Sequence, residues 1–392
     1  MTQLAIVGCG IIGAILAYEL SCTDASPGLK ITVIDHQPPA RGATGAALGV
    51  MMGAISLKNA KSRAWQLRRD SLERYETLIP ELIAKTGRSI PYNRHGILKL
   101  CTTWKPTLEK WHALAAERRE QQFPLEILTP EAAADRVPGL HLNRVLAAVY
   151  SAHDRQVEPV PLVEAAIAAA HAQGVEFVWD RDVIACEVEG DRLVALKLQR
   201  STGNVETLAI DALMITAGTG SAAIANGLLP QSESLQIVNV LGQALHLRPR
   251  SPFDPATPVI TCDDIHIVPR SDGTLWVGAT LEFPAEDTST ASNPLLPNDL
   301  VPDPVPDPVP DPQALDRLLS AAISFYPSLA EADVITRWQG MRPRPVGRSA
   351  PVIEPVAGLT NALLATAHYR NGILLAPATA QRAIGWLAHQ DC

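Results

Sequence analysis

A glycine-rich turn between two apolar strands is the feature of this sequence that most restricts its fold. The apolar segment Leu4–Val7 runs into Gly8-Cys9-Gly10-Ile11-Ile12-Gly13, and the apolar helical stretch Ala14–Leu20 follows. A second apolar strand, Ile31–Ile34, ends on Asp35. A Gly-x-Gly-x-x-Gly turn between a strand and a helix, with an acid about twenty residues later, is typical of a dinucleotide-binding βαβ unit, in which the acid binds the ribose.

Each residue of the turn has a physical role in such a unit. Gly8 permits the tight turn, Gly10 lets the backbone approach a pyrophosphate, and Gly13 lets the helix pack closely on the strand. Ile11 and Ile12 begin the helix, whose N-terminus offers unpaired N–H groups and a partial positive charge to phosphates. The turn therefore predicts a bound dinucleotide; the alternative is a glycine-rich turn in an ordinary α/β protein.

Composition excludes several classes of function. The chain has 392 residues, 47% of them apolar, and a net charge of −8 without a basic patch, so we expect no nucleic-acid partner. No apolar run reaches the roughly 20 residues that span a bilayer, and the N-terminal run lacks a basic leader and a cleavage site. The six cysteines form no C-x-x-C pair and no zinc spacing. We expect a cytoplasmic protein with no membrane partner and no metal site.

Hydrophobic periodicity and turn residues predict alternating helices and strands along the rest of the chain. The Ser-Asp-Gly segment 271–273 predicts a hairpin turn. The expected helices are 62–85, 107–121, 163–173, 313–326 and 373–389, and the expected strands are 97–100, 147–151, 175–179, 182–189, 193–199, 212–217, 238–247, 266–269, 275–279 and 363–367.

A proline repeat interrupts this pattern. Residues 301–312 are three copies of Val-Pro-Asp-Pro. Proline at every second position excludes a helix and an interior strand, so residues 294–312 are expected to form an extended surface loop. A neutral loop expansion is one interpretation and a docking segment for a partner is the other.

Five blocks of the sequence carry a resemblance to a known family. The chain resembles the D-amino-acid-oxidase-like flavoproteins and, within them, the glycine oxidases of thiamine biosynthesis. The blocks are Ile6–Gly13 with Asp35, Ala43–Ala47, Ile267–Gly273 with Val277–Thr280, Trp338–Pro343, and His368–Thr379.

The resemblance implies a mixed α/β fold with two domains and non-covalently bound FAD. A Rossmann-like FAD-binding domain would be built from residues 1–86, 150–232 and 338–392. An antiparallel-sheet substrate domain would be built from residues 87–149 and 233–337. The family also suggests a homo-oligomer.

The resemblance further implies which residues contact FAD. Gly8, Gly10 and Gly13 would hold the pyrophosphate and Asp35 the adenosine ribose. The helix that begins near Gly372 would direct its positive N-terminus at the N1/C2=O edge of the flavin. The remaining implied contacts are Thr44, Ala46, Ala47, Val183, Gly218, Arg370, Asn371 and Ile373.

The matched position for a substrate carboxylate is Arg342, since a guanidinium binds a planar carboxylate through two parallel hydrogen bonds. The alternative is an arginine that only structures its loop. Two positions depart from the family: His266 stands where glycine oxidases have tyrosine, and Leu281 where they often have methionine. His266 is either a substrate hydrogen-bond donor whose charge depends on pH or a strand-end histidine without a role, so the substrate is left open.

The implied reaction is the oxidation of glycine, sarcosine or a small D-amino acid by hydride transfer to flavin N5. The products would be the 2-oxo acid, ammonia or an amine, and hydrogen peroxide formed from oxygen. One alternative is a dehydrogenase that passes electrons to a quinone or carrier. A non-catalytic flavin-binding scaffold and an NAD-dependent enzyme are weaker alternatives, because Arg342 and the later blocks favour an FAD enzyme.

Overall fold

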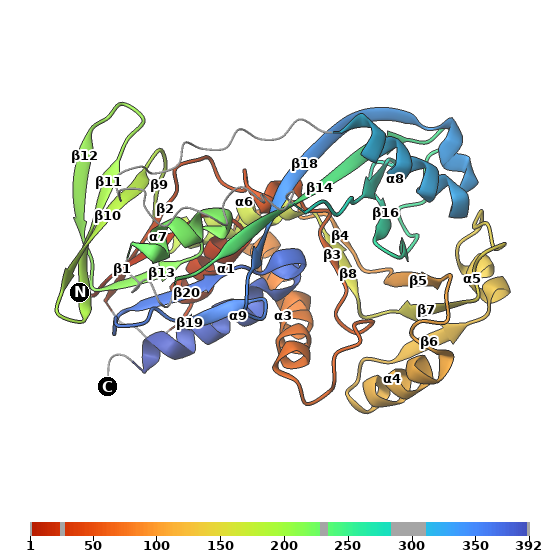
Figure 1. The fold of residues 1–392 in the computed structure, drawn as a ribbon, viewed down its shortest axis with the longest axis horizontal. Helices are drawn as coiled ribbons and strands as arrows, with labels where there is room; N and C mark the ends of the chain where they lie inside the picture. The colour runs from red at the N-terminus through yellow and green to blue at the C-terminus, as the bar shows by residue number, and fades with distance from the viewer. Residues whose placement is uncertain (1, 24–27, 228–233, 284–310, 390–392) are drawn as a thin grey trace, which may run out of the picture.

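The computed structural model describes residues 2–23, 28–227, 234–283 and 311–389 (Figure 1). Residues 294–310 of the predicted proline-rich loop lie outside the described part of the chain. Two large β-sheets organise the molecule, one parallel for most of its strands and one antiparallel for most. The predicted mixed α/β fold class is therefore confirmed.

The mainly parallel sheet carries the glycine-rich turn. Its strand order is β19-β20-β13-β1-β2-β9; β1 lies between β13 and β2 and runs parallel to both. The strands are β1 (Thr2–Val7), β2 (Leu29–Ile34), β9 (Glu176–Val178), β13 (Ala212–Ile215), β19 (Val352–Pro355) and β20 (Ala362–Thr366). Four consecutive residues of β1, Leu4–Val7, are all buried, because both faces of this sheet are covered.

Different elements cover the two faces of the parallel sheet. Leu4 and Ile6 belong to a core shared with four helices: α1 (Ile11–Ser21), α3 (Arg63–Thr86), α6 (Pro159–Ala172) and α9 (Gly372–Ala388). Ala5 and Val7 pack on the other side against α7 (Ser221–Asn226) and a small antiparallel sheet, which lies at one end of the molecule (Figure 1). Its strands are β10 (Asp182–Glu189), β11 (Arg192–Gln199) and β12 (Val205–Ala209).

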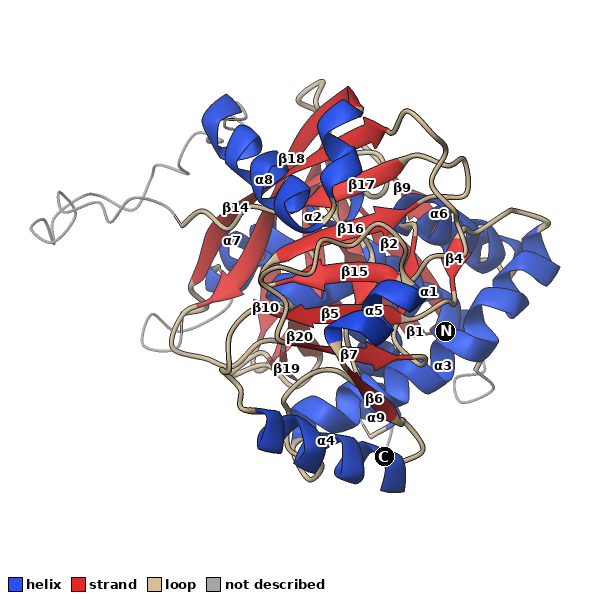
Figure 2. Cartoon of the chain, turned by 90° about the vertical axis from the view of Figure 1, so that its right-hand side faces the viewer, coloured by secondary structure: helices blue, strands red, loops and turns tan. Residues whose placement is uncertain are grey.

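The second large sheet has eight strands in the order β18-β14-β17-β16-β15-β5-β7-β6. One face packs on α5 (Pro130–Arg136) and α8 (Pro312–Phe325), which lie in front of the sheet in Figure 2. The opposite face turns toward the parallel layer. The strands are β5 (Ile97–Cys101), β6 (Leu125–Leu128), β7 (Ala147–Ser151), β14 (Ile237–Arg248), β15 (Val259–Cys262), β16 (Ile265–Pro269), β17 (Leu275–Gly278) and β18 (Asp333–Pro345).

The long helix α3 and several shorter elements connect these layers. The helix α3 begins at the N-cap Ser62, whose hydroxyl accepts a hydrogen bond from the N–H of Trp65 at 3.2 Å, and it ends at Gly87 in the left-handed conformation. The shorter elements are α2 (Ala43–Ala46), α4 (Leu108–Glu120), β3 (Val50–Met51), β4 (Tyr92–Asn93), β8 (Arg155–Val157), η1 (Gly218–Gly220), η4 (Pro327–Glu331) and η5 (Tyr369–Asn371). Among the described helices, none is long and apolar enough to cross a membrane.

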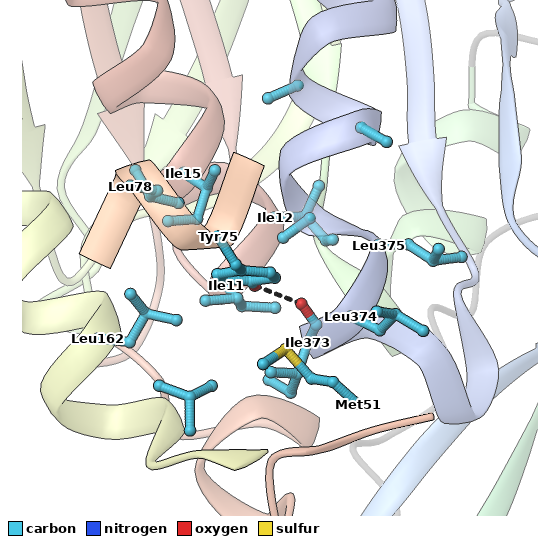
Figure 3. Close-up of a cluster of buried hydrophobic side chains, with 14 of the residues drawn as sticks. Ile11, Ile12, Ile15, Met51, Tyr75, Leu78, Leu162, Ile373, Leu374 and Leu375 are labelled. Carbon is cyan, nitrogen blue, oxygen red and sulfur yellow. Dashed lines mark hydrogen bonds between the residues drawn. The ribbon is translucent and has the colours of Figure 1, made fainter. Parts of the chain in front are cut away.

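A compact apolar cluster joins the N-terminal ends of α1 and α9 to α3 (Figure 3). Ile11, Ile12 and Ile15 of α1 meet Tyr75 of α3 and Ile373 of α9 there. All five side chains are at least 93% buried. The packing fixes two helix N-termini beside each other, which positions the candidate site.

Most of the expected helices and strands are present, with ends displaced by a few residues. The strand β18 is not among the expected ones, because Gly340, Pro343 and Pro345 interrupt its pattern; as an edge strand of its sheet it tolerates proline. The expected domain boundaries near residues 150 and 338 fall inside β7 and β18. The division into two domains remains a prediction.

Candidate active site

The glycine-rich turn is shaped by close backbone contacts. Gly8 has a φ of +104°, and a Cβ placed on it would lie 2.6 Å from the Cα of Ala217. A Cβ on Gly13 would lie 1.9 Å from the carbonyl oxygen of Gly8. The hydroxyl of Thr216 donates to the same carbonyl at 2.7 Å. These short distances leave no room for a side chain at Gly8 in the turn or at Gly13, where the helix packs on the strand.

Gly10 and the N-terminus of α1 face a different neighbour. The N–H of Ile11 donates to the hydroxyl of Thr44 at 3.0 Å, and a Cβ on Gly10 would lie 3.0 Å from the same oxygen. Gly10 supplies no side-chain cap to the helix. The next N–H groups, beginning at Ile12, have no acceptor within the helix because of their position in its first turn. This cradle of helix N–H groups and a threonine hydroxyl fits a pyrophosphate.

Asp35 ties the end of β2 to the turn. Its carboxylate accepts the N–H of Cys9 at 2.7 Å and that of Gln37 at 3.0 Å, and it contacts the ring of His36 at 3.3 Å. Burial acts to raise the pKa of Asp35, but these hydrogen bonds outweigh it and lower the pKa below the usual range. The resulting anion retains lone pairs for ribose hydroxyls, as the predicted role requires.

Val183 and Gly218 lie beside the carboxyl ends of the parallel strands, where ligands bind in open α/β sheets. The N–H of Arg181 donates to the carbonyl of Asp35 at 3.2 Å, which brings the start of β10 to the end of β2. Gly218 follows β13 with a φ of +58°, and its carbonyl accepts the hydroxyl of Thr366 at 3.4 Å. The contacts of both residues with FAD remain predictions.

The residues predicted to surround the flavin converge at the start of α9. A Cβ on Gly372 would lie 4.0 Å from the side chain of Ile11, so the N-termini of α9 and α1 are neighbours. Asn371 accepts a hydrogen bond from the guanidinium of Arg68 at 3.3 Å. Arg370 forms an ion pair with Asp264 at 2.7 Å, which links this end of α9 to the antiparallel sheet. Two helix dipoles therefore direct positive potential at one region.

The predicted residues Ala46 and Ala47 lie at the end of α2, against the antiparallel sheet. The indole N–H of Trp338 donates to the carbonyl of Ala46 at 3.0 Å. A Cβ on Gly340 would lie 2.3 Å from the Cβ of Ala46, so only glycine allows this approach. Ala47 follows in extended conformation as the C-cap. The segment thus connects the pyrophosphate cradle with β18, the strand that carries Arg342.

Arg342 projects over the neighbouring strand β14. One nitrogen, Nη1, donates to the carbonyls of Leu241 at 3.2 Å and Thr280 at 3.0 Å. A Cβ on Gly242 would lie 2.2–2.4 Å from the guanidinium, so this glycine makes the space for it. The side chain lies flat across the strand because no side chain separates it from the backbone there.

The remaining nitrogens of Arg342 are available to a ligand. Within the part of the chain that the structure describes, Nε and Nη2 have no hydrogen-bond partner and the guanidinium pairs with no carboxylate. Burial, followed by the positive charge of Arg370, lowers the pKa of Arg342 from its ordinary value. A half-buried guanidinium with two free donor directions fits the bidentate binding of a carboxylate.

His266 lies on the same face of the sheet. In the strand register it is opposite Gly278, which is opposite Ala244 on β14. Burial, followed by the charges of Arg370, Lys99 and Arg342 against that of Asp264, lowers the pKa of His266 to about 3. The imidazole is therefore neutral at physiological pH. A neutral imidazole still supplies one donor and one acceptor.

The sequence reasoning missed several residues that shape the site. Gly242 and Gly340 are cross-strand neighbours that admit Arg342 and Ala46, respectively. An isolated glycine within an apolar strand pattern is a signal for close approach of another group, and Gly242 carries it. Trp338, Gly340 and Arg342 lie in one of the five recognised sequence blocks, but only the arginine was singled out.

The chain matches a known protein family over nearly its whole length. Residues 3–386 match the family model described as DAO, FAD dependent oxidoreductase. The chain belongs to this family. The match covers nearly all of the described elements, so the cofactor of this chain is FAD; the residues that contact it remain a prediction. The predicted family and cofactor are confirmed.

Individual relatives agree with this assignment. The chain is 27% identical over 386 residues to a glycine oxidase of Pseudomonas aeruginosa, covering 96% of this chain and 92% of the relative. It is 32% identical over 389 residues to the bifunctional protein ThiO/ThiG of Nostoc sp., of which it spans 51%. The crystal structure of glycine oxidase from Geobacillus kaustophilus superposes with a TM-score of 0.82 at 24% identity, covering 99% and 95% of the two chains. The predicted enzyme class, an FAD-dependent amino-acid oxidase, agrees with these relatives.

Proposed function

We propose that this enzyme oxidises glycine, sarcosine or small D-amino acids to the 2-oxo acid with release of ammonia or an amine. The proposal rests on the surroundings of the Arg342 side chain. Its guanidinium is half-buried, held from behind by two backbone carbonyls, and open at Nε and Nη2 toward the sheet face that carries His266. A site built to bind one planar carboxylate suits an α-amino acid.

The protein's contribution to the reaction is mainly orientation. Arg342 would bind the carboxylate and so fix the direction of the substrate Cα–H, because the carbonyls of Leu241 and Thr280 restrain the guanidinium itself. Holding the reacting carbon in one geometry removes most of the entropic part of the barrier. His266 is neutral, so it would donate or accept a hydrogen bond without adding charge to the site.

When bound, FAD would supply the redox chemistry, in which a hydride from the substrate carbon is taken up and its two electrons reduce oxygen to hydrogen peroxide. The N-termini of α1 and α9 would stabilise the negative charge of the cofactor. The imino acid hydrolyses in water to the 2-oxo acid, so no acid or base side chain is required for that step. Relatives that are bifunctional ThiO/ThiG proteins support a role of the product in thiamine biosynthesis.

A dehydrogenase that passes electrons to a quinone or carrier is the second candidate. The relatives named glycine oxidase support oxygen as the acceptor. The distinction rests on peroxide yield: good reduction of a redox dye with poor formation of peroxide would favour the dehydrogenase.

The test of the proposal is anaerobic reduction of the yellow holoprotein. Glycine, sarcosine, D-alanine and D-proline are added in turn and the loss of flavin absorbance is recorded. Bleaching by at least one substrate, followed by stoichiometric peroxide when air is admitted, is the expected result. A holoprotein that none of these substrates reduces would overturn the assignment while leaving FAD binding intact.

A further inference from the structure

A row of three polar residues crosses the inner face of the antiparallel sheet, next to the Arg342 site. Lys99 on β5 is in register with Thr261 on β15, and Thr261 is in register with His266 on β16. Residues in register on neighbouring strands point to the same face. Ile97 and Val149 on this face belong to the core shared with the parallel layer, so the row faces the FAD-binding side.

The polar atoms of this row lack partners. Thr261 is fully buried, and its hydroxyl makes no hydrogen bond within the described part of the chain. The Nδ1 atom of His266 is likewise buried without a partner. Lys99 is half-buried, and among the described residues no carboxylate or hydrogen-bond acceptor pairs with its ammonium group. Leaving buried polar groups unpaired costs about 1–3 kcal/mol each, so the arrangement is one that a polar ligand would complete.

The charges on this face are also unbalanced. Arg370 is neutralised by Asp264 at 2.7 Å, whereas Arg342 and Lys99 pair with no carboxylate in the described chain. In the strand order His266 on β16 lies between Lys99 on β5 and the Arg342 guanidinium over β14, and both positive charges act on the imidazole. The α-carboxylate of an amino acid would match Arg342, and a second anionic group is needed to match Lys99.

We propose that Lys99, with His266 and Thr261, forms a second carboxylate subsite, and that the preferred substrate is a dicarboxylic amine. The inference rests on the proposed amino-acid oxidation, with Arg342 holding the first carboxylate. The lysine supplies the charge, and the imidazole and hydroxyl supply hydrogen-bond donors. Thr261 sits beneath the subsite, opposite His266 in the strand register.

The spacing of the strands limits the substrate. The strand β16, which carries His266, lies two strands from β14, over which the Arg342 guanidinium lies. Neighbouring strands are about 4.8 Å apart, so His266 lies about 10 Å from β14 at the backbone. Lys99 on β5 is four strands from β14, about 19 Å at the backbone, and would reach the second carboxylate over Thr261 and His266 only through its long side chain. N-(carboxymethyl)glycine and D-glutamate have carboxylates separated by a few atoms and suit this span. Glycine and D-alanine use only the first subsite.

The experiment compares one-carboxylate and two-carboxylate ligands on the FAD-loaded protein. Wild type, Lys99→Met and Lys99→Arg are tested, with Lys110→Met on the exposed face of α4 as the matched control. Dissociation constants of the unreactive acids glutarate and butyrate are measured from the perturbed flavin spectrum. Values of kcat/KM are measured for N-(carboxymethyl)glycine, D-glutamate, glycine and D-alanine.

The expected result is selective. Lys99→Met should weaken glutarate about 10- to 100-fold, the effect of one charged hydrogen bond, and should lower kcat/KM for at least one dicarboxylic substrate to a similar extent. Butyrate and glycine should change less than about 3-fold, Lys99→Arg should retain most of the glutarate affinity, and Lys110→Met should match wild type. Equal losses for one-carboxylate and two-carboxylate ligands, or no preference of wild type for glutarate over butyrate, would overturn the second subsite.

The two proposals fail in different ways. If glycine reduces the flavin but Lys99→Met shows no selective effect, the subsite is refuted and the amino-acid oxidase stands. If no amine reduces the flavin, the oxidase assignment fails, whereas selective loss of glutarate binding in Lys99→Met would still support a dicarboxylate subsite.

Discussion

The hydroxyl of Tyr75 on α3 donates a hydrogen bond to the backbone carbonyl of Ile373 in the first turn of α9 (Figure 3). In a regular helix this carbonyl would accept the N–H of the residue four positions later. That residue is Pro377, which has no N–H. Tyr75 therefore supplies the donor that proline removes, at the helix end that faces the predicted flavin position.

Replacing Tyr75 with phenylalanine should destabilise the protein. The substitution leaves a buried carbonyl without a donor, which costs about 1–3 kcal/mol. The free energy of unfolding, measured by urea denaturation of the holoprotein, should fall by this amount. Affinity for FAD should also fall, because the first turn of α9 loses its anchor.

A double-mutant cycle checks the cause. Pro377→Ala restores an N–H at the position that can reach Ile373, so Tyr75→Phe should cost less in the Pro377→Ala background than in wild type. Equal costs in both backgrounds would show that the hydroxyl acts through some other contact.

Arg342→Lys should reduce kcat/KM for glycine about 10- to 100-fold, since a lysine ammonium lacks the fork that binds a carboxylate through two hydrogen bonds. Most of the loss should appear in KM. Arg337→Lys is the control, because Arg337 lies on the same strand with its side chain exposed. A variant with unchanged KM for glycine would remove Arg342 from the substrate site. FAD content, read from the visible spectrum, should equal that of wild type.

The paired glycines of β14 and β18 should have separable effects. Gly242→Ala places a methyl group 2.2–2.4 Å from the Arg342 guanidinium and should raise KM for the substrate while leaving FAD binding near wild type. Gly340→Ala places a methyl group 2.3 Å from the Cβ of Ala46 and should weaken FAD binding. Steady-state kinetics and FAD titration of the apoprotein measure the two effects.

Gly385→Ala in α9 is the control for these substitutions. A Cβ there meets nothing within 4 Å, so the change should raise stability by about 0.5–1 kcal/mol through helix propensity. If Gly242→Ala and Gly340→Ala shift substrate and FAD affinity equally, the separate roles of the two glycines are wrong.

The pH dependence of stability should contain a contribution from His266. Its folded-state pKa is about 3 and its ordinary value is 6.5, so the unfolded chain binds a proton that the folded protein does not between these values. Stability from this group is fully present above pH 6.5 and is lost as pH falls toward 3, at up to about 1.4 kcal/mol per pH unit. His266→Asn should flatten the slope measured by denaturation.

Part of the slope should survive the His266 substitution, because burial also lowers the pKa of His368 to about 3. The imidazole is neutral between pH 5 and 8, so it should not contribute to the pH dependence of kcat/KM in that range. Every inflection of kcat/KM that wild type shows between pH 5 and 8 should therefore persist in His266→Asn. Loss of such an inflection would show that His266 is protonated in the working enzyme.

Short-range sequence patterns predicted the part of the candidate site that binds the nucleotide. The conformation of the turn from Gly8 to Gly13 and the position of Asp35 at the end of the next strand could be predicted, because a βαβ unit is built from residues close together in the chain. These relationships are local in the chain. The proton state of His266 is not, because it follows from burial and from the charges of Arg370 and Lys99, which reach it from other parts of the chain.

The sequence alone determined the class of cofactor, the parallel layer that holds it and the arginine expected to bind a carboxylate. Tertiary structure decided what surrounds that arginine: the space above Gly242, the neutral His266, and Lys99, which pairs with no carboxylate among the described residues. The physical reason is that strand register brings together residues 99, 242, 261, 266 and 342, which are separated by up to 243 positions in the chain, and no local pattern encodes that register. A substrate is selected by groups that only the completed sheet assembles.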